Sequence, residues 1–216
     1  SHRADGTVGI RTAEEAMGND ISILAFARLV LDAIEATQLE YMIGGSFALF
    51  AWGDVRTTRD FDLVVHLPGQ KISTLSVELE KRQMLVPQEV LLDLLMQPEG
   101  DLPVNAMHLD SSYKAELFLL RPDDTFRATC LARRRFVDLG EPLGEVFVHA
   151  PDDLIINKVN YYGLSRQTKH IRDIASILAV SSDEIDWAYL MKWMRQLGLM
   201  DAWLEVKFEV DKLLNQ

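Results

Sequence analysis

The segment Gly44-Gly45-Ser46 has residue types that suit a phosphate-binding turn. It follows the short apolar run 41–43, a pattern typical of a strand that enters a tight turn. Two glycines let the backbone approach a ligand closely, and a helix that begins just after them would present free N–H groups to an anion. The Ser46 hydroxyl lies at the same helix start. A plain turn or helix cap has the same pattern, so this segment alone does not specify a phosphate site.

A second segment, Asp60-Phe61-Asp62, opens the apolar run 61–65. Strand alternation points both carboxylates to the same face, where they repel each other and are costly to bury unpaired. A divalent cation relieves that repulsion, and Mg²⁺ prefers one or two carboxylates together with substrate phosphate oxygens. Two solvated acids on an exposed strand edge are the alternative. The apolar run instead indicates a central strand whose other face is buried.

The two segments together are more specific than either alone. A strand, a Gly-Gly-Ser turn, a short helix and a strand that opens with Asp-x-Asp would set a phosphate cradle beside a pair of metal ligands. Phosphoryl transfer needs this arrangement, because oxyanions must be held by backbone dipoles next to a cation. We therefore expect Asp60 and Asp62 to face one cleft beside the turn at residues 44–46.

Hydrophobic periodicity predicts the elements that position these segments. An α+β fold is expected: residues 1–18 form a mobile tail, residues 19–150 a core with a mixed β-sheet flanked by helices, and residues 151–216 a helical C-terminal region. Ser181 and Glu184 resemble a capping box for one of the C-terminal helices. The expected helices are 21–37, 46–52, 71–83, 87–97, 152–162, 167–180, 184–197 and 199–214. The expected strands are 41–43, 61–66, 104–109, 114–120, 136–139 and 145–149.

Composition indicates a soluble globular protein. The 216 residues are 48% hydrophobic and 25% charged, and the single cysteine, Cys130, excludes an intramolecular disulfide, which fits a cytoplasmic location. No apolar run reaches the roughly 18 residues of a membrane span. A net charge of −11 disfavours non-specific binding to nucleic acid. Basic residues nevertheless gather as solvated surface or as a phosphate-attracting wall: Arg121, Arg127, Arg133, Arg134, Arg135, Lys158, Arg166, Lys169, His170 and Arg172.

The order and spacing of these motifs resemble the nucleotidyltransferase superfamily with the DNA polymerase β-like fold. The pattern of that family is a Gly-Ser or Gly-Gly-Ser turn, Asp-x-Asp on the next strand and a third acid on a later strand. Ser46 and Asp60 are fourteen residues apart here, and the third acid best matches Glu116, where the family more often has aspartate.

A finer resemblance, over roughly residues 40–180, is to the AbiEii-type toxins of abortive-infection toxin–antitoxin systems. The matching segments are Gly44-Gly45-Ser46-Phe47-Ala48, Arg56-Thr57-Thr58-Arg59-Asp60-Phe61-Asp62 and Lys158…Arg166…Arg172-Asp173. The resemblance implies that Arg56 binds the nucleotide, that Lys158 contacts its phosphates, and that Asp173 acts near the base or the metal-bound water. From the residues alone, Lys158 could equally be a surface lysine, and Arg172-Asp173 a structural ion pair.

The resemblance implies an enzyme that uses Mg²⁺ or Mn²⁺ to move a nucleoside monophosphate from a nucleoside triphosphate to an acceptor. The acceptor could be a tRNA end, a protein or a small molecule, and the helical region could dock an antitoxin protein. The expected metal ligands are Asp60, Asp62 and Glu116; with Lys158 they form the catalytic set. The expected nucleotide-binding residues are Gly44, Gly45, Ser46, Arg56, Lys158 and Asp173. The alternative is a catalytically weak module of the same fold that binds a nucleotide or a partner, and the third acid discriminates between the two.

Several residues invite a functional interpretation that their spacing does not support. No metal-ligand spacing links His66, His108, His149 and His170, so we expect structural histidines. Tyr161 and Tyr162 could stack on a nucleobase or could pack between the core and the helical region.

Overall fold

The computed structural model describes residues 21–97 and 101–215, so the expected tail at 1–18 lies outside the described residues. The sheet contains six strands in the order β3-β4-β2-β1-β6-β5, of which β2/β4 and β1/β6 pair in parallel and the other neighbours pair antiparallel. The strands are β1 (Glu40–Ile43), β2 (Asp60–His66), β3 (Val104–Met107), β4 (Lys114–Leu119), β5 (Arg135–Asp138) and β6 (Glu145–Val148). The α-helices are α1 (Ile23–Ala36), α2 (Leu49–Trp52), α3 (Ile72–Glu80), α4 (Gln88–Met96), α5 (Thr125–Arg133), α6 (Pro151–Ser165), α7 (Lys169–Ser181), α8 (Trp187–Gln196) and α9 (Met200–Leu214).

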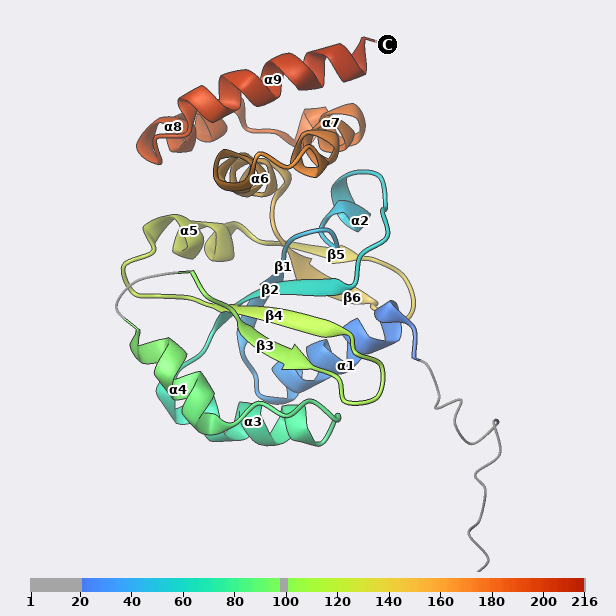
Figure 1. The fold of residues 1–216 in the computed structure, drawn as a ribbon, viewed down its shortest axis with the longest axis vertical. Coiled ribbons are helices and arrows are strands. Elements are labelled where there is room, and N and C mark those ends of the chain that lie inside the picture. The colour runs from blue at the N-terminus through green and yellow to red at the C-terminus, as the bar shows by residue number, and fades with distance from the viewer. Residues whose placement is uncertain (1–20, 98–100, 216) are drawn as a thin grey trace, which may run out of the picture.

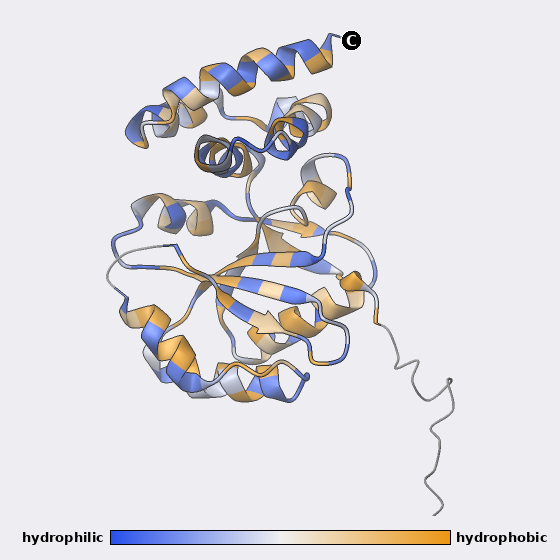
Figure 2. Cartoon of the chain, viewed as in Figure 1, coloured by the Kyte–Doolittle hydropathy of each residue, from blue (hydrophilic) through white to orange (hydrophobic). Residues whose placement is uncertain are grey.

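The two faces of the sheet have different roles. Alternate residues of β2, namely Phe61, Leu63 and Val65, are buried in the main core together with α1 and α3. Because side chains alternate along a strand, Asp60, Asp62 and Val64 lie on the opposite face. There Val64 packs with Met42 against α5, while the carboxylates lie further toward the start of the strand. Figure 2 shows the same alternation of hydrophilic and hydrophobic residues along β2 and β4.

The C-terminal helices have a hydrophobic core of their own. Buried residues of α6, α7, α8 and α9 form a second cluster, which also includes Ala48 and Leu49 beside the glycine turn. Figure 1 shows these helices stacked on the side of the sheet away from α1, α3 and α4. Trp52 ties the two parts together: its indole N–H donates to the His149 carbonyl (2.7 Å), and its carbonyl accepts from the Ser181 hydroxyl (2.9 Å). The site is therefore built where the sheet meets α6 and α7.

Three local expectations need correction. The segment after Gly45 is a turn, and α2 begins only at Leu49, because the N–H groups of residues 49–51 all make the tighter i to i+3 hydrogen bonds. The sequence interpretation also missed α5, whose N-terminus is capped by Asp124. The proposed capping box at residues 181–184 is wrong: residues 182–184 form a 3₁₀ turn (η2), and the Asp186 carboxylate caps α8 by accepting from the Tyr189 N–H at 2.9 Å. In residues 21–97 and 101–215, no helix is long and apolar enough to span a bilayer.

Candidate active site

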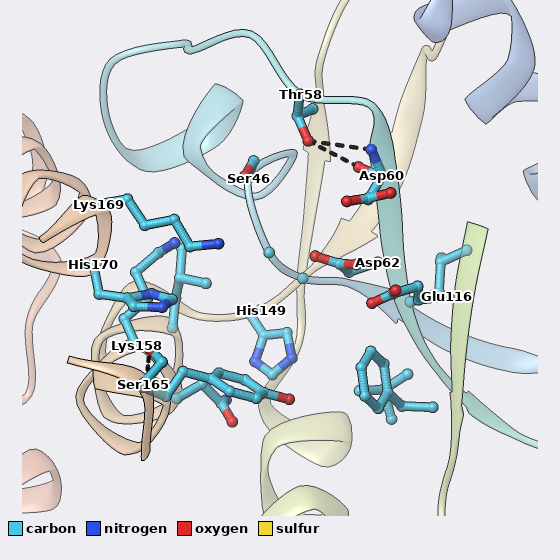
Figure 3. Close-up of a pocket in the computed structure, with 18 of the residues that line it drawn as sticks. Ser46, Thr58, Asp60, Asp62, Glu116, His149, Lys158, Ser165, Lys169 and His170 are labelled. Carbon is cyan, nitrogen blue, oxygen red and sulfur yellow. Dashed lines mark hydrogen bonds between the residues drawn. The ribbon is translucent and has the colours of Figure 1, made fainter. Parts of the chain in front are cut away.

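A cavity of about 360 Å³ lies between the sheet and the helical region, and all but one of the predicted site residues line it. Its acids come from β2 and β4 (Figure 3), and its basic residues come from the segment before β2 and from α5, α6 and α7. The exception is Asp173. The predicted residues that line the cavity are Gly44, Gly45, Ser46, Arg56, Asp60, Asp62, Glu116 and Lys158.

The acids gather because β2 and β4 pair in parallel, with Asp62 directly beside Glu116. Residues at matching positions on paired strands share a face of the sheet, so Glu116 joins Asp60 and Asp62 in the cavity (Figure 3). The pKa of Asp62 is raised to about 6, chiefly by burial and also by the Glu116 and Asp60 carboxylates. These neighbours therefore act in the same direction as burial. A positive charge nearby would stabilise the ionised form of Asp62.

Lys114 is paired with Asp60 in the same strand register. Its ammonium lies 2.5 Å from Glu116 Oε1 and 3.6 Å from Asp60 Oδ1. The hydrogen bond to Glu116 raises the pKa of Lys114, and the negative charges of Glu116 and Asp60 act in the same direction. One lysine thus partly neutralises an acid group with three carboxylates.

The glycine turn is fitted to Asp62. The Gly44 N–H donates to the Asp62 carbonyl (2.9 Å), which holds the turn against β2. Gly45 has a φ of +55°, and a Cβ placed on it would stand 1.8 Å from Asp62 Oδ2. A side chain at position 45 would therefore meet both backbone strain and a steric clash. This glycine lets the backbone lie directly against the Asp62 carboxylate, so the turn and the acid group form one unit.

The basic side of the cavity is organised by Asp173. Its carboxylate is only 3% exposed and accepts from Lys158 Nζ (2.6 Å), Arg56 Nε (3.0 Å) and Arg56 Nη2 (3.3 Å). Burial lowers the pKa of Lys158, and the Asp173 charge opposes that effect. The partners of Asp173 are thus the buried Lys158 and the partly exposed Arg56. Asp173 stands behind these two cations and holds them at the cavity.

His149 and His170 line the cavity, although their spacing in the sequence favours structural histidines. Burial lowers the pKa of His149 to about 3, with Arg127 and Lys158 adding to the effect, so its imidazole is neutral. Its Nδ1 is buried and has no hydrogen-bond partner among the described residues. The ring lies between the acidic and basic sides (Figure 3) and next to Gly44, whose added Cβ would be 3.4 Å from His149 Cδ2. The parallel pairing of Ile43 with Val148 causes this proximity.

The basic residues 121–135 do not form one wall. Arg127 lines the cavity and pairs with Asp101 at 2.9 Å. Arg133 instead forms a buried link to Asp152 and Asp153. The cavity is also lined by Tyr161, Lys169 and His170, and by Ser165 and Gln167, for which the sequence patterns predict no role. His66 and His108 do not line the cavity.

The acid group fits a hard divalent cation only in part. Within the described ranges, no three His, Cys, Asp or Glu side chains converge closely enough to hold a metal by themselves. Two carboxylates completed by substrate phosphate oxygens are nevertheless what Mg²⁺ prefers. The repulsion among Asp62, Glu116 and Asp60, seen in the raised pKa of Asp62, is what a bound cation would relieve. The donor set therefore fits Mg²⁺ or Mn²⁺ together with a phosphate-bearing ligand.

Comparison with known proteins identifies the fold. No family model matches the chain, and neither does a curated protein. The solution structure of the antibiotic-resistance factor ANT(2″)-Ia matches with a TM-score of 0.54 at 17% identity, over 86% of this chain and 96% of that one. The crystal structure of ANT(2″)-Ia in complex with adenylyl-2″-tobramycin matches with 0.52 at 17% identity, over 80% and 97%. An antigenic nucleotidyltransferase-like protein from Paracoccidioides brasiliensis gives 0.48 at 17% identity, over 83% and 91%.

Proposed function

We propose that this chain, which has the nucleotidyltransferase fold, is a metal-dependent nucleotidyltransferase that moves a nucleoside monophosphate from a nucleoside triphosphate to an acceptor. The observation that carries the proposal is the strand register that sets Glu116 beside Asp62. A module that only binds a nucleotide has no need of this third acid. Lys158 and Arg56, on the opposite side of the same cavity, provide positive charges that can bind phosphates.

The acids have distinct roles in this proposal. Asp60 and Asp62 hold the divalent cation, and Glu116 completes the acid group or accepts the proton of the acceptor. When bound, Mg²⁺ would neutralise charge on the phosphate oxygens and orient them. Gly45 brings the backbone against Asp62, so a phosphate held at the turn lies next to the metal ligands.

The basic side binds the triphosphate. Lys158 and Arg56 face the cavity and are held there by Asp173, so their positions are fixed before a ligand binds. In the reaction, an acceptor oxygen forms a bond to the α-phosphorus, and the bond from that phosphorus to the β-phosphate bridging oxygen breaks. Pyrophosphate leaves with the electron pair of that bond, close to Lys158. The acceptor proton passes to Glu116 or to water.

We propose a small hydroxyl-bearing molecule as the acceptor. The net charge of −11 opposes association with a polyanion such as tRNA. A neighbour of the same fold is known in complex with an adenylylated small molecule, adenylyl-2″-tobramycin. The tRNA or protein acceptor, the antitoxin partner and the cytoplasmic location stay predictions from the sequence.

The direct test is transfer of label from each α-³²P-labelled nucleoside triphosphate in Mg²⁺. Three acceptor pools should be compared: hydroxylated small molecules that include aminoglycosides, tRNA, and cell-extract protein. We expect label in the small-molecule pool and none from γ-³²P-labelled nucleotide. Asp62→Asn should abolish transfer, whereas Asp183→Asn, at an exposed acid in η2, should retain it. Label in tRNA or protein would replace the proposed acceptor, and nucleotide binding without transfer or metal dependence would favour the binding module.

A further inference from the structure

We propose that the Lys114 ammonium is a resident counter-cation of the acid group, which a divalent cation must displace from Glu116 before that carboxylate can take part in metal binding. This inference rests on the proposed function, because it concerns the same acids. It assigns a role to a residue that lies next to the cavity and outside the set expected from the motifs. The consequence is a site that binds metal weakly by itself and well together with a nucleotide.

The position of Lys114 follows from the sheet. In the parallel ladder of β2 and β4, Lys114 stands beside Asp60, and two residues further Glu116 stands beside Asp62. The lysine therefore shares the face of the three acids. Its Nζ reaches both strands, 2.5 Å from Glu116 on its own strand and 3.6 Å from Asp60 on the neighbouring strand. An ammonium that bridges two of the three expected metal ligands occupies the charge position that a cation would take.

Partial burial distinguishes this contact from an ordinary surface ion pair. The Lys114 and Glu116 side chains are 31% and 25% exposed, whereas Asp60 is 53% exposed. Water therefore screens the Lys114–Glu116 pair less than it screens Asp60. Among the described residues, Asp60 and Asp62 have no basic side chain at hydrogen-bonding distance. One ammonium thus satisfies Glu116 first and leaves the other two carboxylates for a ligand.

This arrangement couples metal binding to nucleotide binding. A metal alone must compete with Lys114 for Glu116 and is repelled by its charge. A nucleoside triphosphate adds negative charge and phosphate oxygens, and the flexible four-carbon lysine stem lets the ammonium turn toward them. Metal and nucleotide should therefore bind much more tightly together than either does alone. Removal of the lysine charge should weaken this synergy by strengthening the binding of metal alone.

The test is calorimetric titration of Mn²⁺ alone into the full chain, and then Mn²⁺ in the presence of ATP. We expect Lys114→Met to bind Mn²⁺ alone about tenfold or more tightly than the parent, and Lys114→Arg, which keeps the charge, to match the parent. Lys81→Met removes an exposed lysine that pairs with Glu78 and should change nothing. Lys114→Gln is a polar second variant should the methionine variant fold poorly, and unfolding curves check each protein.

Two outcomes separate this inference from the proposed function. If Lys114→Met and Lys114→Gln bind Mn²⁺ no more tightly than the parent while the parent binds Mn²⁺ with ATP, the counter-cation role is wrong and the metal site stands. If no variant binds Mn²⁺ with or without ATP, the proposed metal site itself fails, and this inference fails with it.

Discussion

Asp62 in the cavity and Asp153 in α6 are two buried carboxyls whose pKa is raised to about 6, for different reasons. At Asp153, burial raises the pKa while hydrogen bonding to Tyr189 and the charge of Arg133 lower it. At Asp62, burial is reinforced by Glu116 and Asp60, and only the charge of Lys158 opposes it. The same pKa therefore describes one acid whose neighbours stabilise its charge and another whose neighbours mostly repel it.

The contacts explain this difference. The guanidinium of Arg133 donates to Asp153 Oδ1 (2.9 Å) and Asp152 Oδ2 (2.8 Å), and the Tyr189 hydroxyl donates to Asp153 (2.6 Å). This network links α5 to α6 and α8. The charges of Asp152 and Asp153 therefore help to hold the helical region to the core. Among residues 21–97 and 101–215, no arginine pairs with the acids on β2 and β4, which open into a cavity. A buried acid that is paired with an arginine and a tyrosine hydroxyl indicates a structural role, and one that its neighbours repel indicates a place for a ligand.

The largest effect on stability is expected from Arg133→Met. The substitution leaves Asp152 and Asp153 buried without their cation, and such a change typically costs about 3–5 kcal/mol of the free energy of unfolding. Urea unfolding of the parent and the variant measures the loss. Arg166→Met is the matched control, because Arg166 pairs with Glu205 at the exposed surface, where solvent screens the pair and its loss should change stability little. Equal losses in the two variants would remove the distinction between the two acid groups.

Gly45→Ala is expected to have a smaller effect on stability and a large effect on ligand affinity. A left-handed backbone at a residue with a Cβ costs about 1–2 kcal/mol, and the new Cβ also displaces the Asp62 carboxylate. We expect Mg²⁺-dependent ATP affinity to fall at least tenfold in calorimetry. Gly44→Ala is the control, since its Cβ would meet His149 only at 3.4 Å, and Gly44 is not in the left-handed region. Similar affinity in the two variants would show that the turn is not fitted to Asp62.

Much of this arrangement could be predicted from the sequence because it depends on local patterns. Alternation along residues 60–65 placed Asp60 and Asp62 on one face, and the glycine pair marked the turn. The six expected strands all appear in the structure, with ends that shift by one or two residues. The α+β fold that these patterns indicated is confirmed.

The features that sequence patterns missed depend on pairing between distant strands. His149 reaches the cavity because β6 pairs in parallel with β1, across about a hundred residues of chain. The position of Lys114 beside Asp60 requires the register of β4 against β2. Asp173 was expected at the nucleotide, and only the packing of α7 against α6 shows that its carboxylate is taken up by Lys158 and Arg56. Periodicity within one segment carries none of this information.

The central claim is that Asp62 binds a ligand and lowers the stability of the ligand-free fold. The pH dependence of this effect on stability has a definite sign. The folded-state pKa of about 6 lies above the ordinary value of 3.8, so between these values the folded chain holds the proton more tightly than the unfolded chain does. By linkage, the contribution of Asp62 to stability falls as pH rises through this window, by about 3 kcal/mol at most. Asp62→Asn removes that contribution, so its stability relative to the parent should improve from pH 4 to pH 7.

The most direct measurement is therefore the free energy of unfolding of the parent and Asp62→Asn at pH 7.5, without ligand and with Mg²⁺ and ATP. Without ligand, we predict that Asp62→Asn is at least as stable as the parent. With Mg²⁺ and ATP at about 100 times the dissociation constant, the parent should gain about 2.7 kcal/mol and Asp62→Asn almost nothing, so that their order reverses. A ligand-free variant that is several kcal/mol less stable than the parent, with no ligand-induced gain in the parent, would contradict the account and make Asp62 a structural acid.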